Sequence, residues 1–171
     1  TIFKIAPDVK KWGIIYKSGE LQSEIQYDEL IKVSKELNIE VIPYDLQNTE
    51  SFPKAVEFYN EKMPEWIVLT SSTVIANATK ENIQSISNKI PTLGILEGTV
   101  NMGALIGNLI PWDDVCESGA RLALQLLDGR SIKNRIVKPE KKRLFINKTT
   151  ARQLGLYEKI SEMFKEIHFV E

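Results

Sequence analysis

Residues 11–44 contain the pattern that most restricts how this chain can fold. The apolar run 12–16 ends in a polar cluster that contains glycine, as a buried strand followed by a turn does. Over 21–37, apolar residues recur at three- and four-residue spacing, which predicts an amphipathic helix that ends at Asn38. Residues 40–44 are strand-like again. Such a strand–helix–strand unit almost always returns parallel and right-handed, so the segment predicts a parallel sheet.

The alternation of apolar strands and amphipathic helices continues along the chain. It predicts an α/β fold with an open, mostly parallel sheet and helices on both faces. Residues 1–8 are expected to end a preceding element. Further strands are predicted at 66–69, 91–96, 103–110, 136–139 and 143–147, and further helices at 51–63, 74–88, 112–127, 148–154 and within 156–171.

The composition indicates one ordinary globular domain with a sizeable core, because 43% of the 171 residues are hydrophobic and 26% are charged. The net charge of -1 leaves no broad basic face, which argues against nucleic acid as a partner. Residues 133–143 are locally basic, and we interpret them as a solvated connector rather than a phosphate-binding patch. No apolar run approaches the length of a membrane span.

A single cysteine, Cys116, lies in the predicted helix 112–127 and cannot form an internal disulfide. Its neighbours predict a small, buried apolar residue rather than a nucleophile.

Polar residues follow the predicted parallel strands, at the edge where ligands of open α/β sheets bind. Hydroxyls and backbone amides near helix starts suit a carboxylate or another small polar group. The alternative is that Ser23 and Ser72 merely cap helices. The polar positions are 17–20 with Gln22 and Ser23 after the first strand, 44–45 after the second, 70–73 after the third and 97–99 after the fourth.

Enzyme templates fit poorly. The chain has no dinucleotide-binding glycine motif and no Walker loop. Its one histidine, His168, lies in the tail, which argues against histidine triads and multi-histidine metal sites. Glu97 ends a core strand without a second carboxylate, so we interpret it as a ligand-binding acceptor or a structural anion. The sequence therefore predicts no catalytic residue, no metal and no cofactor.

Several segments resemble the second half of the ABC-transporter substrate-binding protein family related to the TrpX-type aromatic amino-acid binders. The similarity covers nearly the whole chain in family order, and the run from Ile146 to Leu156 carries it most strongly. The segments are 9–20, 70–74, 103–105, 127–129 and 146–156.

The resemblance implies a type I periplasmic binding protein, in which two hinged α/β lobes trap a small molecule. Residues 1–10 would end a preceding element or hinge, and 11–99 would form the C-terminal lobe. Residues 100–171 would form the crossover, the hinge strands and helices packing towards the other lobe. The N-terminal lobe has no counterpart here, so we expect a fragment or isolated domain with the missing lobe as its partner.

The resemblance also implies which positions face the ligand. Two loops depart from the family pattern: Lys17-Ser18 stands where Asn-Pro is common, and Ser71-Ser72 where Asp-Asn is common. The implied ligand-binding residues are Ser18, Gln22, Ser23, Ser71, Ser72, Thr73, Glu97 and Thr99.

The leading functional hypothesis is a non-catalytic solute-binding module of an ABC-type importer, for an amino acid or a related small polar or aromatic molecule. Its partners would be that small molecule and an ABC permease, and its location would be extracytoplasmic. The alternative is an extracytoplasmic ligand-sensing domain of a membrane signalling protein. A small α/β hydrolase or transferase is a third hypothesis, against which the missing nucleophile–base pair counts.

Overall fold

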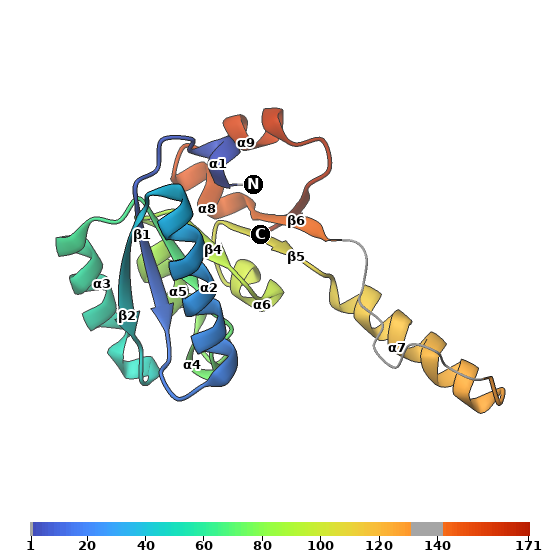
Figure 1. Cartoon of the computed structure of the whole chain (residues 1–171). Coiled ribbons are helices and arrows are strands. Elements are labelled where there is room, and N and C mark those ends of the chain that lie inside the picture. Colours follow the sequence, from blue (N-terminus) through green and yellow to red (C-terminus); the bar gives the residue numbers. More distant parts are fainter. Residues whose placement is uncertain (1, 131–141) are drawn as a thin grey trace.

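A computed structural model describes residues 2–130 and 142–171 of this chain. Its centre is a seven-stranded sheet with the order β2-β1-β3-β4-β5-β6-β7 (Figure 1). Strands β1 to β5 are parallel, β6 is antiparallel to β5, and β7 is parallel to β6. The predicted fold class is confirmed. The strands are β1 (Lys11–Tyr16), β2 (Glu40–Asp45), β3 (Trp66–Leu69), β4 (Thr92–Gly94), β5 (Ile106–Leu109), β6 (Arg143–Asn147) and β7 (His168–Val170).

Helices cover both faces of the sheet, because successive strand side chains point to opposite sides. Ile15 faces a core shared with α3, α4 and α5, while Ile14 faces a core shared with α1, α2, α8 and α9. The helices are α1 (Ile2–Ile5), α2 (Leu21–Leu37), α3 (Phe52–Lys62), α4 (Thr73–Ala76), α5 (Lys80–Ser87), α6 (Glu97–Asn101), α7 (Trp112–Leu127), α8 (Lys148–Gln153) and α9 (Tyr157–Met163), with a 3₁₀ turn η1 (Thr49–Ser51).

Three predicted elements need correction. The helix expected at 74–88 is two helices, because Thr79 opens α5 with a capping box that involves Asn82. Glu97 begins helix α6 instead of lying in a loop. The tail forms β7 after α9, a strand that was not predicted. The strand predicted at 136–139 and most of the basic stretch 133–143 lie outside the described residues.

Asn147 is buried where β6 meets α8, in the run that carries the family resemblance most strongly. Its amide nitrogen donates to the carbonyl of Val100 at 3.0 Å, and its amide oxygen accepts from the backbone N–H of Thr150 at 2.9 Å. The hydroxyl of Thr150 donates to the carbonyl of Gly103 at 2.8 Å. These bonds fix the turn between α6 and β5 to the start of α8.

Replacing Asn147 with alanine is expected to lower the free energy of unfolding by about 2–4 kcal/mol, because a helix cap is lost and a buried carbonyl loses its donor. Urea denaturation followed by circular dichroism measures this loss. Thr149→Ala is the matched control, because Thr149 is exposed on the same helix. Equal stabilities of the two variants would contradict the assignment.

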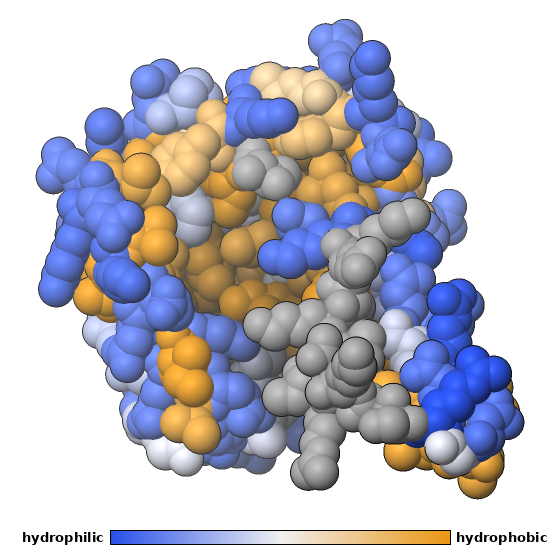
Figure 2. All heavy atoms as spheres, turned by 45° about the vertical axis from the view of Figure 1, so that its right-hand side comes forward, coloured by the Kyte–Doolittle hydropathy of each residue, from blue (hydrophilic) through white to orange (hydrophobic). Residues whose placement is uncertain are grey.

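Helix α7 projects from the body and buries none of its residues (Figure 1). Trp112 is 63% exposed and Leu127 83% exposed, and Figure 2 shows apolar atoms on this projection at the lower right. Cys116 is exposed as well, so its predicted burial is wrong: α7 has no element packed over its apolar side within the described residues.

The chain leaves the body for α7 and returns to it at neighbouring positions. Leu109 at the end of β5 pairs with Arg143 at the start of β6. Arg143 also forms an ion pair with Asp114 of α7 at 3.1 Å. Helix α7 therefore begins beside the start of β6. Within the described residues, no helix combines the length and apolarity that crossing a membrane requires.

Candidate functional site

The carboxyl ends of β1 to β4 share one edge of the sheet, because these four strands are parallel neighbours. In Figure 1, β1 and β2 run towards the edge where α4 lies. The loops after β1, β3 and β4 therefore lie side by side, and α4 packs against α6. The topology places the predicted polar loops along a common edge.

Ser18 links the first loop to the end of β2. Its backbone N–H and its hydroxyl donate to the two carboxylate oxygens of Asp45, at 2.9 and 2.6 Å. The Ser18 hydroxyl also accepts a hydrogen bond from the side chain of Gln47 at 3.0 Å. The Ser18 hydroxyl therefore both donates and accepts within the protein. Burial, followed by the charge of Asp45, raises the pKa of nearby Tyr16, so the Tyr16 phenol stays neutral.

Glu20 links the first loop to the third. Its carboxylate accepts hydrogen bonds from the backbone N–H of Thr73 at 2.7 Å and from the Thr73 hydroxyl, and it pairs with Lys17 at 3.0 Å. Burial would raise the pKa of Glu20, but the Thr73 hydrogen bonds and the Lys17 charge hold this pKa below its ordinary value. The two loops are joined most firmly when Glu20 is ionised.

Glu20→Gln is expected to flatten the acid limb of the stability profile. The pKa of Glu20 is lower in the folded protein, so ionisation stabilises the fold at neutral pH, and this contribution is lost as the pH falls below about 4.5. Urea denaturation at pH 7 and pH 3.5 measures the difference. A variant whose stability falls between these pH values as much as that of the unmodified chain would contradict the prediction.

Ser23 and Ser72 are both fully buried, and they differ in their roles. The Ser72 hydroxyl accepts from the backbone N–H of Ile75 at 3.3 Å, so the capping alternative holds for Ser72. Ser23 lies inside α2 and not at its N-cap, which is Glu20. Its hydroxyl accepts from the backbone N–H of Lys17 and bonds to the Thr70 hydroxyl, both at 2.9 Å. The capping interpretation is therefore wrong for Ser23, whose hydroxyl links the first loop to Thr70, directly after β3.

Ser71 is half-buried and is held by Gln26 of α2. The backbone N–H of Ser71 donates to the amide oxygen of Gln26 at 2.8 Å. The amide nitrogen of Gln26 donates to the Ser71 hydroxyl at 2.6 Å. Residues 45 apart in sequence are thereby locked together.

Among the described residues, the side chains of the other three predicted residues, Gln22, Glu97 and Thr99, make no hydrogen bond. Gln22 is exposed, Glu97 is half-buried at the start of α6, and Thr99 is 1% exposed. Within the described residues, the Thr99 hydroxyl has no hydrogen-bond partner, and Glu97 makes no ion pair. Whether any of the eight predicted residues contacts a ligand stays a prediction.

Lys17, Glu20 and Asp45 were among the predicted polar positions but not in the implied ligand-binding set, and the structure shows that they hold the loop after β1. Gln26 was not predicted at all, although it fixes Ser71. Gln26 could have been found from its position, one helical turn after Gln22 and on the same side of α2. The partners of Glu20 and Asp45 depend on contacts between distant segments.

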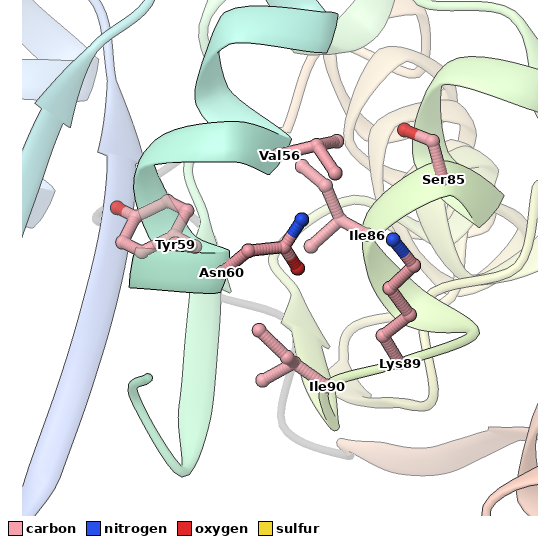
Figure 3. A pocket seen from close by; sticks show the side chains of 7 residues that line it. All are labelled: Val56, Tyr59, Asn60, Ser85, Ile86, Lys89 and Ile90. Atoms are coloured by element: carbon pink, nitrogen blue, oxygen red, sulfur yellow. The ribbon is translucent and has the colours of Figure 1, made fainter. Parts of the chain in front are cut away.

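A shallow crevice without room for a water-sized molecule lies between α3 and α5, away from this edge (Figure 3). Apolar Val56, Ile86 and Ile90 line it, with Asn60 and Lys89 beside them. It contains none of the predicted site residues. Within the described residues, no group of three or more His, Cys, Asp or Glu side chains is placed to hold a metal ion.

The profile of the ABC transporter substrate binding protein family matches residues 1–166, and this chain belongs to that family.

Individual relatives are about twice as long as this chain. A tyrosine-binding protein of Clostridioides difficile (strain R20291) is 26% identical over 164 residues, which are 95% of this chain and 48% of the relative. The ligand-free, open structure of a substrate-binding protein with adhesive properties from Clostridium difficile matches with a TM-score of 0.82 at 21% identity, over 99% of this chain and 57% of that chain. A Streptococcus pneumonia ABC domain in complex with L-Trp has a TM-score of 0.77 at 22% identity, over 98% and 58% of the two chains. These structural similarities show the fold.

Proposed function

We propose that residues 11–99 form one wall of a non-catalytic solute site in the substrate-binding protein of an ABC importer. The observation that carries the proposal is the cross-linked polar edge, in which Glu20, Gln26 and Asp45 hold the loops after β1 and β3 in place. Polar groups fixed in advance bind a small solute without a further ordering cost. The family supports a location outside the cytoplasm and a permease as partner.

An amino acid is the proposed solute. A relative named for tyrosine and a structural neighbour that holds L-Trp support this class. The edge offers both charges, with the ammonium of Lys17, which pairs with Glu20, on one loop and the carboxylate of Glu97 on another. An α-amino acid carries both charges that these groups would meet.

The second wall is proposed to come from a lobe that this sequence does not include. The chain spans about half the length of its relatives. The exposed apolar side of α7 would pack against that lobe, so residues 100–171 would serve as crossover and hinge. Domain closure would then trap the solute, because the closed form binds it more tightly than the open form.

Thermal denaturation of the full-length protein against the twenty L-amino acids tests the function. At a hundred times its dissociation constant, a solute adds about 2.7 kcal/mol to the stability of the folded state. We expect at least one amino acid to give such a shift, and sugars and polyamines to give none. No response to any amino acid would overturn the proposal.

The packing of α7 gives a separate prediction. Leu126→Asp should destabilise the full-length protein by about 2 kcal/mol or more, because the introduced charge would be buried between the lobes. The same change should alter the stability of residues 1–171 by about 0.5 kcal/mol or less, since Leu126 is 60% exposed here. Urea denaturation of both proteins measures the two effects. Equal effects in both would contradict the docking of α7.

A further inference from the structure

The contact between Gln26 and Ser71 fixes the direction of each hydrogen bond. The backbone N–H of Ser71 is a donor, so the Gln26 atom 2.8 Å from it must be the amide oxygen. The other Gln26 atom, 2.6 Å from the Ser71 hydroxyl, is therefore the nitrogen. Since that nitrogen only donates, the hydroxyl oxygen accepts, and the hydroxyl hydrogen of Ser71 is left to donate elsewhere.

Two other hydroxyls along this edge donate within the protein. The Ser18 hydroxyl donates to Asp45, and the Thr73 hydroxyl donates to Glu20. The Ser71 hydroxyl hydrogen has no acceptor among the described residues, and its side chain is half-buried and reachable from outside. On the neighbouring loop, the positive charge of Lys17 is paired with Glu20 at 3.0 Å. The Ser71 hydroxyl is therefore an uncommitted donor beside this ion pair, where the loops after β1 and β3 meet.

We propose that Ser71 is a specificity-determining residue that donates a hydrogen bond to the carboxylate of the bound solute, and that Gln26 is the positioning residue that keeps Ser71 a donor. The inference rests on the proposed amino-acid function. It adds an orientation: the carboxylate lies at the loops after β1 and β3, and the ammonium points towards Glu97 after β4.

Gln26→Glu tests the positioning role almost without a change of shape. The introduced carboxylate accepts both from the Ser71 N–H and from its hydroxyl, so the hydroxyl turns inwards and no longer donates to the solute. Ser71→Ala removes the same donor directly. Lys32→Gln is the control, because it changes the net charge by the same amount at an exposed position on α2.

The experiment is calorimetric titration of the full-length protein with the tightest binder among the twenty L-amino acids and with its decarboxylated amine. At pH 7.5, Ser71→Ala and Gln26→Glu should each weaken the amino acid about tenfold or more, the usual size for a hydrogen bond to a charged group. Both should leave the amine within about twofold, which also shows that the variants are folded.

The double variant separates hydroxyl orientation from charge repulsion. In the Ser71→Ala background, Gln26→Glu should cause no further loss, because the donor on which it acts is already absent. A further loss there, an equal effect on amine and amino acid, or unchanged binding by Ser71→Ala would overturn the inference while the amino-acid function stands. If the unmodified protein binds no amino acid, the function and the inference both fail.

Discussion

Residues 1–171 alone are expected to bind the solute roughly a hundredfold more weakly than the full-length protein. An aromatic side chain buries about 150–250 Å² in a closed site, so the loss of one wall re-exposes roughly 100 Å². At about 25 cal/mol per Å², this is about 2.5 kcal/mol, close to a hundredfold in the dissociation constant. In the proposed arrangement, the strand-end loops form only one wall of the site.

Calorimetry with the tightest amino acid on both proteins measures this ratio. The polar edge is already cross-linked in the single lobe, so the weaker binding would reflect the absent wall and not a disordered one. Addition of the separately produced N-terminal half should restore part of the affinity, if α7 docks on it. Equal affinities would show that one lobe suffices and would contradict the two-lobe proposal.

Tyr59→Ala is expected to lower the free energy of unfolding by about 3–5 kcal/mol, the usual cost of emptying a large buried aromatic position. Tyr59 is 1% exposed, and its hydroxyl donates to the carbonyls of Ile14 in β1 and Ile42 in β2, at 2.9 and 3.1 Å. Burial raises the pKa of Tyr59, so the phenol remains a neutral donor. This ring joins two strands whose ends carry the candidate site.

Tyr59→Phe separates packing from hydrogen bonding, and we expect it to cost about 1 kcal/mol. Gly13 makes the close packing possible, because a Cβ there would lie 2.7 Å from the Tyr59 ring. Urea denaturation followed by circular dichroism measures the variants. A Phe variant as unstable as the Ala variant would assign the role of Tyr59 to its hydroxyl instead of its ring.

The local features of this fold could be predicted from the sequence because they depend on neighbouring residues. Hydrophobic periodicity predicted β1, α2 and β2, and Asn38 ends α2 with a φ of 53°, as expected of a left-handed C-terminal stop. The same periodicity could not reveal β7, since a three-residue strand is defined by its partner β6 and not by its own pattern. The prediction that Cys116 is buried was wrong for a related reason. Amphipathicity predicts that a helix has an apolar side but not which element covers that side.

The polar edge shows the same division. The alternation of strands and helices, readable from the sequence, predicted parallel strands, so that Ser18, Ser71 and Glu97 follow strands that end on one edge. Only the tertiary structure decided how these loops are held, because Glu20 meets Thr73 and Gln26 meets Ser71 across 53 and 45 residues. Hydrogen-bond direction depends on which atoms face each other in space. For that reason, the donor character of Ser71 became visible only once the chain was folded.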